Sequence, residues 1–384
     1  MTDTYQRYSR ALGRITPAPA LVLDLDAFEH NIQWALKHAG NKKIRIATKS
    51  LRSVELIRRV LKTSPVFQGL MAFTLAEALW LREQGFTDIL LGYPTHDRAS
   101  LAELARNPHG ITLMVDLPEH IEFLQGFDAT FNICLDVDLS MDLPFVRFGV
   151  YRSSITSLAT LESTLAAIKK APHVRLEGLM GYEAQIAGVM DKSSWLMRFL
   201  KGLSIPRLRE RRHNLLKHVL QQGYQLRFVN GGGTGSLQTT NQEEPVTEVT
   251  VGSAFYAPVL FDNYQDFQLR PAMVFGLPVV RIPKPGMITC LGGGYIASGA
   301  TDPIKTPTPY LPAGLKLEKN EGTGEVQTPL HTRGHHQFQL GDWVFMRHAK
   351  AGEPCERFNT IHLLRGEKIV GQCTTYRGDG KAFL

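Results

Sequence analysis

The sequence of 384 residues has few cysteines and no long apolar run. Its four cysteines are too few for a disulfide-stabilised scaffold, and their spacings include no Cys-x-x-Cys pair. Its apolar stretches are far shorter than the roughly 20 residues of a membrane helix, so we expect no membrane partner. The first residues, MTDTYQRYSRALG, are polar and lack the apolar region of a signal peptide. We therefore expect a cytoplasmic protein.

The chain also lacks a long basic or acidic tail, although 43 basic residues against 36 acidic ones give a net charge of +7. An acidic residue and apolar residues at helical spacing interrupt the densest basic group, which comprises Arg207, Arg209, Arg211, Arg212 and Lys217. This pattern predicts a solvated helix face rather than a nucleic-acid-binding surface. We expect no nucleic-acid partner.

What the sequence does contain is a regular alternation of β-rich runs and helical patterns. The eight runs are Ile44–Thr48, Phe67–Ala72, Asp88–Tyr93, Ile111–Val115, Phe131–Val137, Leu176–Tyr182, Gln225–Val229 and Val246–Val251. They are nearly continuously apolar, which is typical of parallel strands covered on both faces. Eight such strands favour a closed (β/α)8 barrel of the TIM type over an open sheet. The Gly-x-Gly-x-x-Gly motif of a dinucleotide-binding sheet is missing after the first strand.

Beyond about residue 256 the helical periodicity fades, and prolines, glycines and short β runs become dense. The runs are Val279–Ile282, Met287–Leu291, Asp342–Met346 and Thr360–Leu364. They predict a smaller, mainly antiparallel β domain over 256–384, after a barrel over 20–255. Residues 1–19 could join the β domain, and the strand-like run Ala20–Leu25 could pair with it.

Lys49 ends the first barrel strand, in the sequence IRIATKS. Active sites of such barrels lie at the carboxyl ends of the strands. A partly desolvated lysine there can lose its proton and attack a carbonyl group. By itself, however, a lysine at a strand end is more often a surface residue.

A glycine run, NGGGTGS, directly follows the seventh strand. Consecutive glycines let backbone N–H groups converge on an anion, and barrels often bind phosphate after strands seven and eight. The alternative is a flexible turn. We predict a phosphate cradle formed by this run and by residues after the eighth strand, namely Gly232, Gly233, Thr234, Gly235, Ser236, Gly252, Ser253 and Tyr256.

Arg147 and Tyr182 follow the fifth and sixth strands and could hydrogen-bond a polar aromatic ring. Each is also a common type of surface or core residue. Together with Lys49 and the phosphate cradle, they suit a phosphorylated aldehyde held as a Schiff base. Pyridoxal 5′-phosphate fits that description.

The motifs, in this order, resemble the alanine-racemase-like, fold-type III family of pyridoxal-phosphate enzymes. Within it they are most similar to the D-threonine aldolase and D-serine dehydratase branch. The resemblance begins at TPAPALVLDLDAFEHNI and continues through DVDLSMDLPFVRFGV and GLMGYEAQ to VGSAFYAP. It implies a cofactor-bearing barrel, a C-terminal β domain and a homodimer. It also implies that Lys49 is the Schiff-base lysine, that the glycine run holds phosphate, and that Arg147 and Tyr182 face the cofactor.

The chain departs from that branch at two positions. Ala47 stands two residues before the lysine, where the branch usually has a histidine. The branch also carries a His-x-Cys or His-x-Asp metal pair, whereas here His348 lies well upstream of Cys355. These two residues would suit a divalent metal such as zinc or manganese, which would polarise a substrate hydroxyl. The alternative is a strand-end histidine and an ordinary buried cysteine.

We therefore expect a pyridoxal-phosphate-dependent lyase, an aldolase or a dehydratase, that acts on small β-hydroxy D-amino acids. One alternative is an amino-acid racemase, for which Lys49 would supply only one of two bases. The other is a non-catalytic pyridoxal-phosphate-binding protein, against which the long segment beyond the barrel argues.

Overall fold

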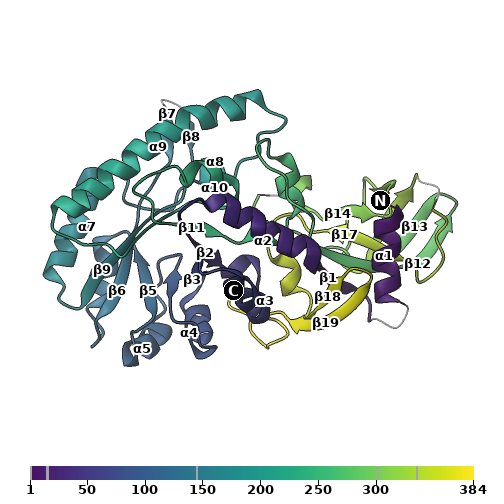
Figure 1. Ribbon diagram of the computed structural model, residues 1–384, viewed down its shortest axis with the longest axis horizontal. Coiled ribbons are helices and arrows are strands. Elements are labelled where there is room, and N and C mark those ends of the chain that lie inside the picture. Colours follow the sequence, from purple (N-terminus) through teal and green to yellow (C-terminus); the bar gives the residue numbers. More distant parts are fainter. Residues whose placement is uncertain (1, 14–16, 144–145, 301, 334–335) are drawn as a thin grey trace. The chain divides into compact units, whose positions relative to one another are not determined.

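The computed structural model describes residues 2–13, 17–143, 146–300, 302–333 and 336–384 (Figure 1). The chain divides into two compact units. The β unit contains Met1–Trp34, Ser50–Arg58 and Ser253–Ala382, and the barrel unit contains Ala35–Lys49, Arg59–Gly252 and Phe383–Leu384. Two segments that precede residue 59 in the sequence thus group with the β unit, and the predicted domain bounds stay a prediction.

The barrel unit is built on eight parallel strands that close in the order β10-β11-β2-β3-β4-β5-β6-β9. The strands are β2 (Lys43–Ala47), β3 (Phe67–Ala72), β4 (Ile89–Leu91), β5 (Ile111–Val115), β6 (Phe131–Asp136), β9 (Val174–Gly181), β10 (Phe228–Gly231) and β11 (Glu248–Val251). The predicted (β/α)8 barrel is therefore confirmed, with all eight strands in the predicted order.

Helices alternate with these strands. They are α2 (Leu25–Ala39), α3 (Val54–Thr63), α4 (Leu75–Glu83), α5 (Arg98–Arg106), α6 (Pro118–Leu124), α7 (Leu158–Lys170), α8 (Ala184–Ala187), α9 (Trp195–Gln221) and α10 (Leu237–Thr240). Local capping fixes several starts, since Thr74 accepts the Glu77 N–H at α4 and Ser157 accepts the Thr160 N–H at α7. The strands are covered by these helices, and all residues of β4 and β5 are buried.

A buried ion-pair group lies inside the barrel around Arg45 of β2. Its Nε and Nη2 donate to the two carboxylate oxygens of Glu248 at 2.7 and 3.0 Å, and Nη1 donates to Asp88 at 3.1 Å. The Phe228 ring centroid lies 5.2 Å from the guanidinium carbon. Because Asp88 immediately precedes β4, this group ties strands together near their amino ends, opposite the end that carries Lys49.

The β unit contains a nine-stranded sheet. Its strands are β1 (Ala20–Asp24), β12 (Met273–Lys284), β13 (Met287–Leu291), β14 (Thr308–Leu311), β15 (Leu315–Leu317), β16 (Gln327–Thr332), β17 (Trp343–Arg347), β18 (Thr360–Arg365) and β19 (Lys368–Thr374). The pairing of β1 with β18 is parallel, and the other described pairings are antiparallel. The predicted antiparallel domain and its pairing with the run before the barrel are confirmed.

Helix α1 (Thr2–Leu12) packs on this sheet, with Tyr5, Tyr8 and Leu12 buried against Val274 and Phe345. Among the helices of the described residues, none combines the length and the hydropathy that crossing a bilayer requires.

Candidate functional site

Lys49 lies immediately after β2, at the carboxyl end of the barrel strands. The buried hydroxyl of Thr48 donates to the carbonyl oxygen of Met71 on β3 at 2.9 Å and so anchors the turn. The Lys49 side chain is exposed, and its Nζ donates to the hydroxyl of Tyr93 at 2.7 Å. Tyr93 follows β4, so this bond links the ends of two strands. An accessible, oriented amine of this kind can react with a carbonyl group.

Tyr182 follows β9 at the same end of the barrel. Burial raises the pKa of Tyr182 to about 12, Arg152 opposes this shift, and Glu183 and Tyr93 reinforce it. The guanidinium carbon of Arg152 lies 5.4 Å from the centroid of the Tyr182 ring. Tyr182 therefore keeps its proton at neutral pH and can donate a hydrogen bond to a bound group.

The glycine loop, Gly232–Ser236, follows β10. Gly232 has a φ of +80°, a conformation that favours glycine. A Cβ atom on Gly233 would lie 3.2 Å from Cε2 of Tyr182 and 3.2 Å from Cβ of Ala187. The loop backbone therefore lies against the tyrosine ring.

Three N–H groups of the glycine loop form hydrogen bonds that fix its conformation, among them the Ser236 N–H, which donates to the carbonyl oxygen of Gly233 at 3.0 Å. The Gly232 N–H donates to Glu183 at 3.0 Å, and the Gly233 N–H donates to the hydroxyl of Ser236 at 3.0 Å. The second bond closes the short 3-10 helix over Thr234–Ser236.

Lys49 and the glycine loop each contact a tyrosine at this end of the barrel. Lys49 bonds to Tyr93, and Tyr93 is near enough to Tyr182 to raise its pKa. Tyr182 in turn lies against Gly233. Three of the predicted site elements, Lys49, Tyr182 and the glycine loop, are thus brought together.

Acidic side chains also gather at this end of the barrel. Asp116 follows β5, accepts the Ser154 N–H at 2.7 Å and lies 3.1 Å from Nδ1 of His120. Asp136 is the last residue of β6. Burial and the neighbouring Asp116 raise the pKa of Asp136 to about 7, against the lowering effect of Arg152. A carboxyl group with such a pKa can gain or lose a proton near neutral pH.

In a comparison with protein families, residues 23–258 match the alanine racemase N-terminal domain. The chain belongs to this family. The match covers more than half of the chain, including the whole barrel, and it confirms the predicted resemblance.

Individual curated proteins are similar to the chain at low sequence identity. The curated 3-hydroxy-D-aspartate aldolase of Paracoccus denitrificans is 24% identical over 254 residues, which are 65% of this chain. The matched region spans only 62% of that relative's length.

Solved structures share the fold over nearly the whole chain. D-threonine aldolase from Filomicrobium marinum has a TM-score of 0.80 at 19% identity, covering 95% of this chain and 96% of its own. D-threo-3-hydroxyaspartate dehydratase from Delftia sp. HT23 has a TM-score of 0.78 at 18% identity, covering 95% and 98%. Alanine racemase from Bacillus anthracis has a TM-score of 0.67 at 19% identity, covering 94% of this chain and 98% of its own.

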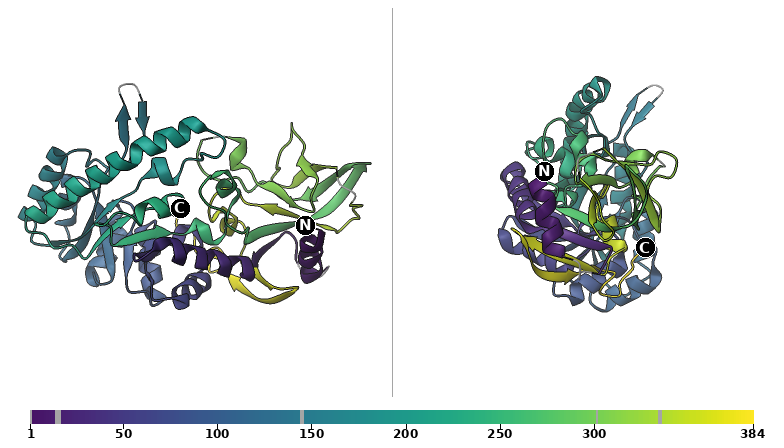
Figure 2. Two further views of the ribbon diagram at one scale, coloured as in Figure 1. Left: turned by 45° about the horizontal axis from the view of Figure 1, so that its top comes forward. Right: turned by 90° about the vertical axis from the view of Figure 1, so that its right-hand side faces the viewer.

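In this alanine racemase family member, Arg147 lies on a two-stranded hairpin of β7 (Met141–Leu143) and β8 (Val146–Phe148), seen projecting in the left panel of Figure 2. Its guanidinium pairs with Asp138 at 3.0 Å and with Asp142 at 3.1 Å. The arginine that lies over the Tyr182 ring is Arg152 instead. The predicted role of Arg147 toward a cofactor stays a prediction.

The residues predicted after the eighth strand fall in both units. Gly252 directly follows β11 in the barrel unit, whereas Ser253 and Tyr256 belong to the β unit. Tyr256 is fully buried, and its hydroxyl donates to the carbonyl oxygen of Leu51 at 2.7 Å. The Tyr256 hydroxyl therefore already donates its hydrogen bond to a residue of the β unit.

His348 and Cys355 are both fully buried in the β unit. Burial lowers the pKa of His348 to about 4, so the imidazole is neutral at pH 7, and neither ring nitrogen forms a hydrogen bond of ordinary geometry to the described residues. Burial raises the pKa of Cys355 to about 12, and its Sγ donates to the carbonyl oxygen of Leu51 at 3.5 Å. The described residues contain no group of three or more His, Cys, Asp or Glu side chains placed to hold a metal.

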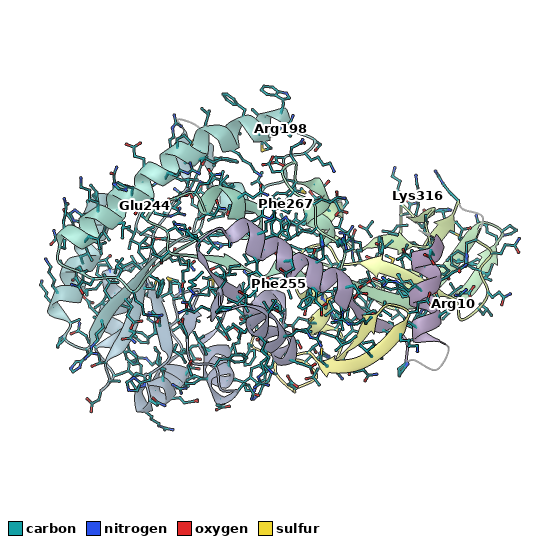
Figure 3. All side chains as sticks on the ribbon, in the orientation of Figure 1. Arg10, Arg198, Glu244, Phe255, Phe267 and Lys316 are labelled. Carbon is teal, nitrogen blue, oxygen red and sulfur yellow. The ribbon has the colours of Figure 1, made fainter. Side chains whose placement is uncertain are left out.

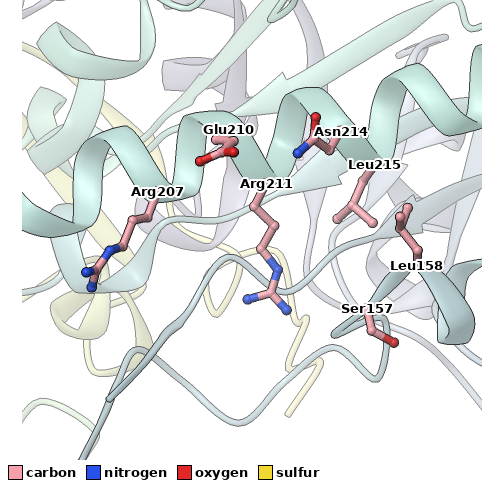
Figure 4. A pocket seen from close by; sticks show the side chains of 7 residues that line it. All are labelled: Ser157, Leu158, Arg207, Glu210, Arg211, Asn214 and Leu215. Carbon is pink, nitrogen blue, oxygen red and sulfur yellow. The ribbon is translucent and has the colours of Figure 1, made fainter. Parts of the chain in front are cut away.

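A shallow pocket of about 280 Å³ lies elsewhere on the barrel unit, between α9 and the start of α7 (Figure 4). Arg207 and Arg211 project into it from the same side of α9. None of the predicted site residues lines this pocket.

Sequence reasoning missed Tyr93, Asp136 and Arg152 at the barrel end. The available signal was position, because Tyr93 and Asp136 occur where a barrel strand ends. The prediction of a solvated basic helix face was wrong for Arg212, which is fully buried and lies 3.2 Å from Glu183. Its burial depends on acidic partners distant in the sequence, which the pattern of α9 alone does not reveal.

Proposed function

We propose that the protein is a pyridoxal-phosphate-dependent lyase, an aldolase or a dehydratase, that acts on small β-hydroxy D-amino acids. The observation that carries this proposal is the placement of Lys49, bonded to Tyr93, at the end of the barrel where Tyr182 lies against the glycine loop. The names of its relatives support the substrate class, since they include aldolases and a dehydratase of 3-hydroxylated D-amino acids.

The residues present fit pyridoxal phosphate. Lys49 offers an exposed amine, and the glycine loop offers backbone with no side chain between it and Tyr182. Lys49 would hold the cofactor covalently, the loop would hold the phosphate, and the protonated Tyr182 would hydrogen-bond the ring. When bound, the cofactor supplies an electron sink for negative charge that develops on the substrate.

The chain's own residues would then orient groups and move protons. The hydroxyl of Tyr93 accepts the hydrogen bond from Lys49 Nζ and fixes the direction of that amine. When Lys49 is not bonded to the cofactor, its amine would be able to take up a proton at Nζ. Asp136 can hold or release a proton near neutral pH, because of its raised pKa.

A metal at His348 and Cys355 remains a prediction. The neutral, buried imidazole of His348 suits a metal ligand, but Cys355 already donates a hydrogen bond to Leu51. No third acidic, histidine or cysteine ligand is placed beside them in the described residues. The donor set is incomplete, so no step is assigned to a metal.

A homodimer and a cytoplasmic location belong to the same proposal. Trp195, Phe199 and Leu203 form an exposed apolar stripe on one face of α9, the helix on which Figure 3 labels Arg198, and a second copy would cover it. No disulfide joins the four cysteines, which are all among the described residues, and this supports a reducing compartment.

The decisive experiment is a screen of D- and L-β-hydroxy amino acids with the reconstituted protein. Glycine plus aldehyde would report aldol cleavage, and a 2-oxo acid would report dehydration. We expect turnover of at least one D substrate, a far poorer L counterpart, and no activity in Lys49→Ala. Equal rates on D- and L-alanine without consumption of a β-hydroxy substrate would favour the racemase alternative.

Repeating the screen with a chelator and measuring bound metal tests His348 and Cys355. Metal-free protein with full activity would contradict the metal prediction. Cofactor binding without turnover of any amino acid would support the non-catalytic alternative.

A further inference from the structure

The buried carboxylate of Glu183 contacts the chain at both ends of the segment that carries the glycine loop. One oxygen, Oε2, accepts the Gly232 N–H at 3.0 Å. The other, Oε1, accepts the hydroxyl of Thr240, the last residue of α10. A single side chain thus fixes where the segment 232–240 begins and where it ends.

Arg212 from α9 holds this carboxylate in place. Its Nη2 donates to Oε2 of Glu183 at 3.2 Å and to the carbonyl oxygen of Gly181 at 3.1 Å. Its Nη1 donates to the carboxylate of Glu243. Burial acts to lower the pKa of Arg212, but Glu183 and Glu243 outweigh it and the net pKa is raised. The guanidinium therefore stays charged between two acids.

A simple turn would not need this buried network of charged side chains, whose desolvation is unfavourable. Two buried carboxylates share one buried guanidinium, and burial of charge is unfavourable unless each group is paired and hydrogen-bonded. A flexible turn could satisfy the Gly232 N–H with water. A fixed network instead suits a loop whose N–H groups must already point at an anion before it arrives, because preorganisation lowers the cost of binding.

We propose that Glu183 is a positioning residue for the glycine loop. By holding Gly232 and Thr240, it keeps the loop in the conformation that binds the phosphate group of the cofactor. It acts through the backbone and not by touching the cofactor. This inference rests on the proposed function, because it takes pyridoxal phosphate as the ligand of the loop.

Glu183→Gln and Glu243→Gln form a matched pair of variants. Each removes one of the two buried acids that flank Arg212. Only Glu183 accepts the Gly232 N–H. Both variants should lose similar thermal stability, so that a difference between them reports the loop contact.

The full-length apoprotein is titrated with pyridoxal phosphate and with pyridoxal, which lacks the phosphate. The ratio of the two dissociation constants measures how much the phosphate contributes. We expect Glu183→Gln to reduce this ratio roughly tenfold or more, and Glu243→Gln to leave it unchanged. Hydrogen exchange of the segment 231–240 should accelerate in Glu183→Gln only.

Thr240→Val covers the case in which Glu183→Gln fails to fold, because it removes one donor to Glu183 and leaves the charges intact. It should reduce the ratio in the same direction, whereas Thr240→Ser should restore it. Equal ratios in the wild type, Glu183→Gln and Thr240→Val would overturn the positioning role while leaving the proposed function standing. Failure of the wild type to bind pyridoxal phosphate would overturn both.

Discussion

The amine of Lys49 donates a hydrogen bond of 2.7 Å to the hydroxyl of Tyr93. The two residues follow β2 and β4, so the bond bridges two strand ends that are separated by β3. Lys49 Nζ also lies 5.3 Å from the centroid of the Tyr93 ring. An exposed lysine side chain has many rotamers, and a fixed acceptor reduces them to those that aim the amine in one direction.

Tyr93→Phe should therefore impair catalysis more than cofactor binding. The variant keeps the ring but removes the acceptor, and a hydrogen bond to a charged group is worth about 1.5–3 kcal/mol. We expect kcat/KM to fall ~10- to 100-fold, while borohydride reduction still fixes the cofactor on Lys49. Tyr151→Phe is the control, because Tyr151 is 87% exposed. Equal activity of the two variants would show that the Lys49 bond has no catalytic role.

Asp136→Asn should change how stability depends on pH. The pKa of Asp136 in the folded protein is about 7, well above the ~3.9 of an unfolded chain. Its contribution to stability is therefore full below about pH 4 and is lost as the pH rises through about 7. An amide carries no charge, so the variant should be more stable than the wild type at about pH 8, by more than ~2 °C in Tm. At about pH 4 the two Tm values should converge, and a constant difference would contradict the raised pKa.

The eight barrel strands could be predicted because burial on both faces leaves a local signal. Runs such as Phe67–Ala72 and Ile111–Val115 are mostly apolar, and both match the strands residue for residue. The predicted ends of the strands were less accurate than their predicted existence. Val174 and Arg175 join β9 ahead of the predicted start at Leu176, because pairing with β6 extends the strand beyond its apolar run.

The candidate site could be predicted only where its chemistry is local. Lys49 and the glycine loop are visible as a strand-end lysine and a glycine run. Arg45 and Arg212 were not visible as buried residues, because each depends on carboxylates from distant segments. Glu248 lies far along the chain from Arg45, and no local sequence pattern predicts an ion pair between two such distant residues.

Gly233→Ala should weaken cofactor binding by displacing Tyr182. The new Cβ would lie 3.2 Å from the tyrosine ring and from Ala187, closer than ordinary packing allows. We expect the dissociation constant for pyridoxal phosphate to rise roughly tenfold or more, equivalent to the ~1–3 kcal/mol cost of overpacking. Gly202→Ala is the control, since a Cβ there meets nothing within 4 Å. If both variants bind the cofactor as the wild type does, the loop does not depend on this close approach.

Arg45→Met should destabilise the barrel strongly. Removal of the guanidinium leaves Glu248 buried without its partner, and breaking a buried pair costs about 3–5 kcal/mol. Arg227→Gln is the comparison, because Arg227 also pairs with Asp88 but is 44% exposed. That change should cost less than about 1 kcal/mol. Denaturant titration measures the free energy of unfolding of both variants. Similar decreases in this free energy would show that burial of the ion pair does not determine how much its removal destabilises the protein.

The apolar stripe on α9 should hold two copies of the chain together. Trp195 and Phe199 are 72% and 55% exposed, and Leu203 continues the same helix face one turn further. Large exposed aromatic side chains of this kind anchor protein interfaces, where a few residues supply most of the binding free energy.

The double variant Phe199→Glu, Leu203→Glu would place two like charges in that interface, and desolvating them without partners is unfavourable. We expect sedimentation to show a dimer of the 42.9 kDa chain for the wild type and a monomer for the double variant. Leu220→Glu is the control, because Leu220 is 49% exposed near the other end of α9, and it should remain dimeric. A dimeric double variant would place the interface elsewhere on the chain, and a monomeric wild type would contradict the predicted homodimer.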